Sequence, residues 1–293
     1  MTKRQQTQGE LFVLDSPLLA EVHGERSLMA YPFFVLTKTA WRRSLSYKND
    51  NVSIEIGPGP KGVATIYDKE VLLYIASLLV SKLDAGDPVA QDFYFTAHDL
   101  FRVTGVNASA RSYTRLSDAL ERLQGTQIKT NIEAGGVGQA GFFSWLSEAQ
   151  LRYTRTKDGD KRLEGVQVRL CDWLYRSILQ DRHVLEYSPT YFQLGPVERR
   201  LYEVARSRCG NDAITVDLDD LRLQLGYQNS LKHFRHVMKG IVEEDAIPGY
   251  SISLGNEILA ASAKPSQRRS AASRVTISPR PYDLDDESAI RNP

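Results

Sequence analysis

Cysteine is scarce in this 293-residue chain, and a long apolar run is missing from it. The two cysteines, Cys171 and Cys209, cannot build a disulfide framework, so we interpret them as packed thiols of a protein in a reducing cytoplasm. The most apolar run, Val71 to Val80, is shorter than the roughly 20 residues of a membrane-spanning helix and is expected to be a core helix. We therefore expect a cytoplasmic protein with no signal peptide and no membrane partner.

The sequence also has no large excess of charge of either sign. Its formal net charge is +1, so any affinity for nucleic acid must come from local patches of cations. Apolar residues make up 42% of the chain and charged residues 25%, which is typical of a globular protein. The length is sufficient for two domains with ordinary cores.

Residue patterns that carry catalysis or hold a metal are not recognisable. The five histidines include no His-x-His pair, the metal-binding pattern of initiators that nick their origin. His233 and His236 are three residues apart on an expected helix, but no Cys, Asp or Glu ligand lies nearby on that face. The glycine-rich stretch 57–62 lacks the Gly-Lys-Ser/Thr ending of a phosphate-binding loop. We expect no enzyme, no metal site and no cofactor.

What is present centres on residues 213–254. Asp217 or Asp219 can cap a short helix that runs to Leu225, where Gly226 ends it. Ser230 can then cap a second helix. A strand follows at 250–254, and residues 274–278 read as one more strand, which would make the loop between them a wing. A plain linker remains the alternative for that loop.

The second helix of this stretch is expected to have two faces. Its apolar residues recur at helical spacing and predict a core face: Leu231, Phe234, Met238, Ile241 and Val242. Its cations share the opposite face, with no acid among them: Lys232, Arg235, His236 and Lys239. A basic face is often only a solvated face. The glycine turn, the strand that follows and a second copy of the pattern favour a helix that enters a major groove of DNA.

The second copy lies in the first half of the chain. A helix from Thr96 to Val103, a turn at 105–107 and a helix from Ser109 to Gln124 repeat the order. On this second helix the outward cations Arg111, Arg115 and Arg122 are diluted by acids. Strands at 128–132 and 142–146 are expected to form the wing, and two further strands within 148–171 are expected between the domains.

These patterns predict an α+β fold with tandem winged helix-turn-helix domains. We expect a flexible N-terminal segment at 1–27 and a winged-helix domain at 28–180 that binds DNA and can dimerise through exposed strand edges. A second DNA-binding winged helix is expected at 181–282, followed by a disordered acidic tail at 283–293.

Three stretches resemble the plasmid replication initiator protein A family: MAYPFFVLTK (29–38), GVATIYDKEVLLYIASLL (62–79) and EYSPTYFQLGPVERRLYEVARSRCG (186–210). The resemblance implies a tandem winged-helix initiator that binds repeated sequences of double-stranded origin DNA. It further implies help from the host initiator and the replicative helicase, and repression of the protein's own gene by a homodimer. A transcriptional repressor without an initiation role and a protein-interaction scaffold are the alternatives.

The candidate DNA-binding residues come from the two second helices and from the expected wing of the second domain. They are Ser109, Arg111, Ser112, Arg115, Asn229, Ser230, Lys232, His233, Arg235, His236, Lys239, Arg268 and Arg269.

Overall fold

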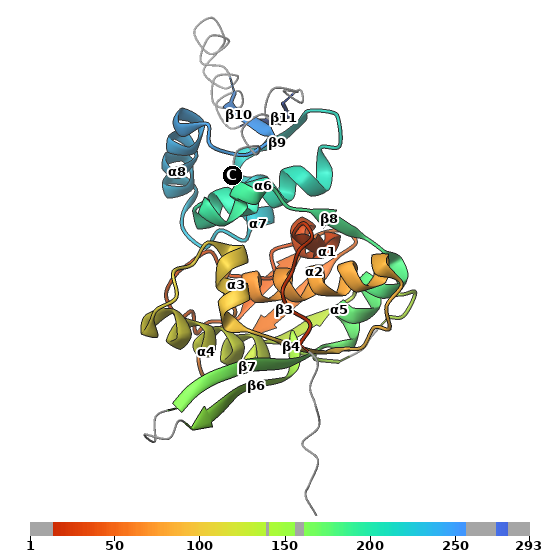
Figure 1. Cartoon of the computed structure of the whole chain (residues 1–293). Helices are drawn as coiled ribbons and strands as arrows, with labels where there is room; N and C mark the ends of the chain where they lie inside the picture. Colours follow the sequence, from red (N-terminus) through yellow and green to blue (C-terminus); the bar gives the residue numbers. More distant parts are fainter. Residues whose placement is uncertain (1–13, 139–140, 156–160, 256–273, 281–293) are drawn as a thin grey trace, which may run out of the picture.

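The computed structural model describes residues 14–138, 141–155, 161–255 and 274–280, which form two lobes. Figure 1 shows the lobes stacked, with most of the chain up to α5 in one and the chain from α6 onward in the other. Each lobe has its own cluster of buried apolar side chains. The chain is therefore a mixed α/β protein with two cores.

The second lobe follows the order helix, strand, helix, helix, strand, strand. Its elements are α6 (Pro196–Arg208), β9 (Ile214–Asp217), α7 (Leu218–Leu225), α8 (Leu231–Glu244), β10 (Tyr250–Leu254) and β11 (Arg274–Pro279). The last strand, β11, lies between β9 and β10 and is antiparallel to both. Val275 and Ile277 of β11 are fully buried in the core that also holds Phe234 and Met238 of α8. The predicted strand at 274–278 is confirmed.

The first lobe repeats this order. The corresponding elements are α2 (Lys69–Ala85), β4 (Asp92–Phe95), α3 (Ala97–Thr104), α4 (Ala110–Gly125), β6 (Leu146–Arg155) and β7 (Lys161–Leu170). Again the last strand is the middle one, because β7 lies between β4 and β6. Every residue from Val71 to Val80 in α2 is buried, which confirms the expected core helix. The two lobes therefore share this element order and strand order, with β5 (Gln127–Thr130) inserted between α4 and β6 in the first lobe.

The strand pair expected at 128–132 and 142–146 is wrong as the hairpin of the first lobe. β5 (Gln127–Thr130) instead joins β3 (Ser53–Gly57) and β2 (Leu45–Lys48) in a separate sheet. Phe143 meets this sheet only through a bridge to Ile128. The long hairpin is β6–β7, which the sequence alone assigns to the region between the domains. The partner of β5 lies far earlier in the chain, so local alternation could not reveal the pairing.

Residues 14–27 are structured, which corrects the expectation of a flexible segment over 1–27. The Asp15 N–H donates to the carbonyl oxygen of Tyr94 (2.7 Å), and the Asp15 carboxylate pairs with Lys82. Further along, β1 (His23–Glu25) pairs antiparallel with β8 (Val184–Glu186), and α1 (Arg26–Ala30) follows it. Residues 1–13, the expected tail at 283–293 and the expected wing tip, Arg268 and Arg269, lie outside the described residues.

The segment that connects the two lobes is called the crossing below. It consists of α5 (Asp172–Arg176), the π-helical turn η1 (Ser177–Asp181), β8 and the 3-10 turn η2 (Pro189–Gln193). Arg182, directly after η1, has φ 52°, so the chain changes direction there.

A buried ion pair joins the two lobes at this crossing. Lys69, the first residue of α2, contacts Glu203 of α6 at 2.6 Å, and both side chains are fully buried. Arg200 pairs with the other oxygen of Glu203, also at 2.6 Å. The hydroxyl groups of Tyr187 and Tyr191 donate to Glu203 Oε1 at 3.2 and 2.6 Å. The carboxylate is thus surrounded by donors from both lobes.

The environment keeps this pair charged at neutral pH. Burial lowers the pKa of Lys69 to about 8, against the opposing effect of Glu203. Burial alone would raise the pKa of Glu203, but Lys69 and Arg200 outweigh it and hold that pKa below 4.5. Because separating the partners would leave uncompensated buried charges, the pair disfavours other arrangements of the lobes.

Candidate nucleic-acid interface

The turn before α8 is held by side chains on both sides of it. Asp217 caps α7 by accepting from the Asp219 N–H (2.8 Å), and Gly226 ends that helix with φ 71°. Arg222 then pairs with Asp219 at 2.6 Å, and its guanidinium reaches the carbonyl oxygens of Tyr227 and Asn229, each at 3.4 Å. The direction in which the chain enters α8 is therefore fixed.

The first turn of α8 is equally well defined. Ser230 caps the helix, because its Oγ accepts from the His233 N–H at 3.3 Å. The Tyr227 hydroxyl and His233 Nδ1 are 2.5 Å apart, and the Tyr227 ring also packs on Phe234. Asn229 is exposed beside the cap. His233 is thus oriented by a buried tyrosine rather than being a free surface side chain.

The outer face of α8 is basic and unpaired. Lys232, Arg235, His236 and Lys239 are all exposed, whereas Phe234, Met238 and Ile241 on the other side are buried. No residue that the structure describes forms an ion pair with these four side chains. The first acid of the helix is Glu243, in its last turn. Because a helix rises about 1.5 Å per residue, these four cations extend over about 10 Å along one face of α8.

The matching face of α4 is narrower. Ser109 caps the helix by accepting from the Ser112 N–H (3.2 Å), and Arg111 and Arg115 are exposed. Ser112 is buried, and its hydroxyl donates to the carbonyl oxygen of Asn107 at 2.6 Å. Ser112 therefore fixes the turn and does not face outward.

The rest of α4 is closed to a ligand by ion pairs. Arg122, which the sequence places on the outer face, turns inward, and its guanidinium donates two bonds of 2.7 Å to Asp68. Asp118 pairs with Lys61 at 3.1 Å. Only the first two turns present free cations. Tyr113 and Thr114, which the sequence reasoning missed, are exposed between Arg111 and Arg115.

A metal or cofactor site is not built by these residues. Within the described ranges, no group of three or more His, Cys, Asp or Glu residues is arranged to hold a metal ion. His233 and His236 have no carboxylate or thiolate beside them on α8. Among the helices that the structure describes, none combines the length and apolarity required to cross a bilayer.

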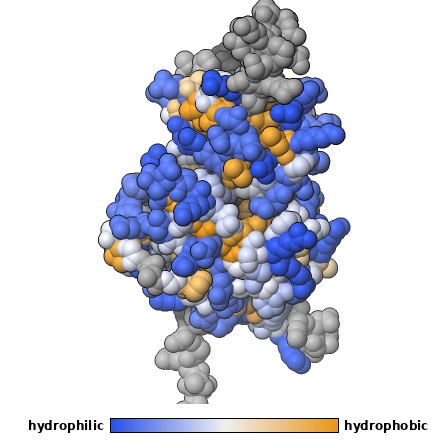
Figure 2. Space-filling model, turned by 180° about the vertical axis from the view of Figure 1, so that it is seen from behind, coloured by the Kyte–Doolittle hydropathy of each residue, from blue (hydrophilic) through white to orange (hydrophobic). Residues whose placement is uncertain are grey.

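Hydrophobic side chains do not form one broad patch on the rear face of the molecule. Figure 2 shows them there as separate islands among hydrophilic residues. The large exposed apolar side chains of the described residues are scattered along the chain: Leu14, Leu19, Tyr113, Val137, Phe142, Tyr153 and Leu223. The unpaired cations of α4 and α8 are therefore the more distinctive surface feature.

The helical unit occurs twice, and in each copy a serine-capped helix exposes free cations, which is typical of DNA-binding proteins. The family model for Replication initiator protein A matches residues 23–252. The chain therefore belongs to the replication initiator protein A family, DNA-binding proteins of plasmid replication and not a known class of enzymes.

A relative agrees with this assignment. A putative replication protein of Wigglesworthia glossinidia brevipalpis is 32% identical over 254 residues, which cover 83% of this chain and 88% of that protein. Domains 2 and 3 of RctB share the fold, with a TM-score of 0.58 at 14% identity over 87% of this chain and 96% of theirs. The Pi initiator protein, solved in complex with iteron DNA, has a TM-score of 0.46 at 13% identity over 72% of this chain and 88% of its own.

Proposed function

We propose that this chain initiates plasmid replication by binding repeated sequences in double-stranded origin DNA through two winged helix-turn-helix domains. In each domain the second helix of the motif, α4 or α8, would lie in a major groove. The strand pairs β6–β7 and β10–β11 would be the wings. The proposal places the protein in the cytoplasm and gives it no catalytic step of its own.

The observation that carries the proposal is the outer face of α8. Its four basic side chains project from a helix whose start is fixed by Ser230 and whose opposite side is anchored in the core. A helix in this setting can contact base edges with its first turns and phosphates with its later ones. The candidate residues for base contacts are Asn229, Lys232 and Arg235. Lys239 is a candidate for a phosphate contact.

The first domain supports the same function with fewer contacts. Arg111 and Arg115 are the free cations of α4, and Ser109 lies exposed at its cap. Each of its two three-stranded sheets has two edge strands, and among these β2 and β6 would offer unpaired backbone groups to a second copy of the chain. We therefore propose that a homodimer, if formed to repress the protein's own gene, uses this domain. Light scattering that finds a stable dimer of residues 181–282 alone would contradict it.

A footprint on the DNA that flanks the protein's own gene tests the central proposal. Two helices on one chain should protect successive major grooves on one face, ~34 Å apart, over about 20 base pairs. Because the two domains differ, the protected sites should be direct repeats without strict palindromy. Protection of a single groove would rule out tandem reading, and no protection at all would favour a protein-interaction scaffold. Recruitment of the host initiator and the replicative helicase would be tested next, by adding them to the protected complex.

A further inference from the structure

The segment 38–43 carries exposed cations in a part of the chain that lacks acids. Residues 26–49 contain five lysines and arginines and no Asp or Glu. Lys38, Arg42 and Arg43 are exposed, and none of them forms an ion pair or a hydrogen bond with a residue that the structure describes. This concentration of unpaired charge is not required by the fold.

Most other arginines of the described chain are engaged by a neighbour. Arg102, Arg122, Arg199, Arg200 and Arg222, for example, all pair with carboxylates. Arg155 and Arg274 adjoin residues outside the described ranges, and the side chain of Arg162 is not described. Among the remaining described arginines, those without a hydrogen-bond or ion-pair partner are confined to α4, α8 and the segment 38–43: Arg42, Arg43, Arg111, Arg115 and Arg235. The segment therefore resembles the two candidate DNA-reading helices in this respect.

One side of the segment is bonded to residues 61–64, which in turn contact α4. The Val63 N–H donates to the carbonyl oxygen of Trp41 at 2.8 Å, and the next residue, Ala64, donates to the hydroxyl of Thr126 at the end of α4 (2.8 Å). Two residues before Val63, Lys61 pairs with Asp118 at 3.1 Å. Asp118 follows Arg111 and Arg115 at helical spacing, so this contact lies on the outer face of α4.

The other side of the segment faces the turn that leads into α8. A methyl group at Gly226 would lie 2.7 Å from the Cβ of Pro32, so the chain before the segment touches that turn. The chain after it does the same, because Leu45 and Tyr47 of β2 line a cavity of about 150 Å³ together with Tyr227. The segment thus lies between the end of α4 and the start of α8. Figure 1 shows both helices on the same side of the molecule.

Aromatic rings support two of the three cations. The Arg43 guanidinium lies 5.9 Å from the ring centre of Trp41, and Lys38 Nζ lies 5.5 Å from that of Tyr67. Cation–π contacts of this kind leave the N–H donors available to an anion while they restrict the side chain. Arginine donors in such a setting suit phosphate oxygens.

We propose that Lys38, Arg42 and Arg43 form a third DNA contact, which binds the phosphates between the two major grooves that α4 and α8 enter. The inference rests on the proposed function, because it needs both helices on one duplex. Since these cations would meet phosphates, they add affinity and set the position of the protein along the DNA without reading sequence.

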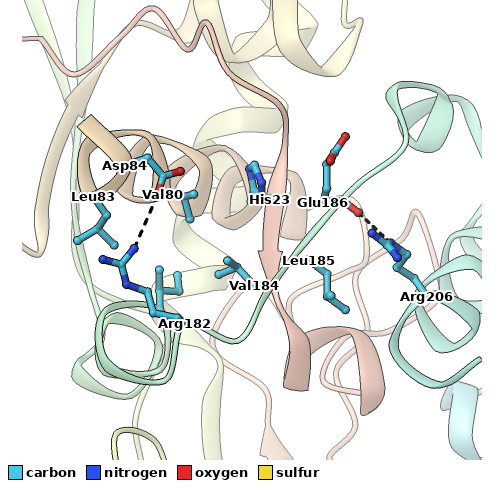
Figure 3. Close-up of a pocket in the computed structure, with 10 residues that line it drawn as sticks. His23, Val80, Leu83, Asp84, Arg182, Val184, Leu185, Glu186 and Arg206 are labelled. Atoms are coloured by element: carbon cyan, nitrogen blue, oxygen red, sulfur yellow. Dashed lines mark hydrogen bonds and ion pairs between the residues drawn. The ribbon is translucent and has the colours of Figure 1, made fainter. Parts of the chain in front are cut away.

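The test compares two double variants of the full chain that lose the same charge. One is Arg42→Gln with Arg43→Gln. The control is Arg182→Gln with Arg206→Gln; these arginines line a cavity of about 400 Å³ at the crossing (Figure 3), beside β8, on the side of the molecule away from α4 and α8 (Figure 1). In the native chain they contact Asp84 (3.8 Å) and the carbonyl oxygen of Glu186 (3.3 Å).

Binding is measured by gel shift at several salt concentrations, on a duplex from the DNA flanking the gene and on a scrambled duplex. Loss of two phosphate contacts should reduce the slope of log K against log salt by about 1.8 and weaken both duplexes by the same factor. The control should keep the native slope. An unchanged slope for the Arg42/Arg43 variant, an equal change in the control, or a loss confined to the flanking duplex would overturn the inference. Absence of binding by the native chain would instead refute the proposed function.

Discussion

Arg235 lies one turn into α8, exposed, between the buried residues Phe234 and Met238. At this position of a recognition helix a side chain reaches base edges, so Arg235→Ala should lose base discrimination. We expect a cost of ~1–3 kcal/mol at one base pair and little change at the others. Competition gel shifts with single-base variants of the bound site measure this. An equal loss on all the variants would show that Arg235 contacts phosphate instead.

Lys239 lies one turn further along and should behave differently. Its ammonium group is a point charge with no described ion-pair partner, at a distance from the helix start where recognition helices meet the backbone. Lys239→Ala should weaken binding to every sequence alike and reduce the salt slope by about one unit. Circular dichroism must show that this variant and Arg235→Ala are folded. If both bind like the native chain at two salt concentrations, α8 is not a recognition helix.

At the scale of elements, the turns that end α3 and α7 have the same backbone conformation but different neighbouring atoms. Gly105 and Gly226 have φ values of 69° and 71°, a region that costs other residues about 1–2 kcal/mol. A Cβ at Gly105 would meet nothing within 4 Å, whereas one at Gly226 would lie 2.7 Å from the Cβ of Pro32.

Gly105→Ala should therefore lower the free energy of unfolding by about 1–2 kcal/mol, the cost of the backbone alone. Gly226→Ala should lower it by more, because the turn must also move away from Pro32. Urea unfolding of the two variants side by side measures the difference. Equal losses would mean that the contact with Pro32 contributes nothing.

The helices α7 and α8 and the strands β10 and β11 of the second lobe could be predicted because their signals are local. Asp217 and Ser230 lie directly before the helices they cap, and Gly226 lies directly after the helix it ends. The strand order of the first lobe could not be predicted in the same way. β5 alternates like a wing strand, but its partner β3 is set by contacts between distant parts of the chain.

The candidate interface could likewise be predicted only in part from the sequence. The basic face of α8 follows from helical spacing, and its exposure agrees with that prediction. Ser112 and Arg122 turn inward because of Asn107 and Asp68, and residue types alone do not show which way such side chains point. The acid-free composition of residues 26–49 was visible in the sequence, but its place between α4 and α8 was not.

At the scale of the whole molecule, the ion pair between Lys69 and Glu203 should be the most sensitive point. Glu203→Gln leaves Lys69 and Arg200 buried without their carboxylate, so we expect a loss of about 3–5 kcal/mol in the free energy of unfolding. Asp118→Asn removes a partly exposed pair with Lys61 and should cost less than about 1 kcal/mol. Urea unfolding at neutral pH compares the two.

The pH dependence gives a second measure of the same pair. The pKa of Glu203 in the folded chain is lower than its ordinary value of 4.5. The contribution of its charged form to the free energy of unfolding is therefore fully present above pH 4.5. That contribution is lost as the pH falls through the lower, folded-state pKa. The gap in stability between the native chain and Glu203→Gln should therefore narrow on acidification below 4.5. A gap that stays constant there would show that the carboxylate charge is not what stabilises the crossing.

The buried pair also sets a condition on the DNA. Because turning one lobe against the other would separate Lys69 from Glu203, we expect α4 and α8, if both enter the DNA, to keep one angle about the axis of the duplex. One base pair inserted between the two grooves rotates the second by about 35° and moves it along the axis. The protein should thus measure helical phase as well as sequence. A site lengthened by one base pair should lose most of its affinity, while one lengthened by a full helical turn would restore the angle but place the groove out of reach.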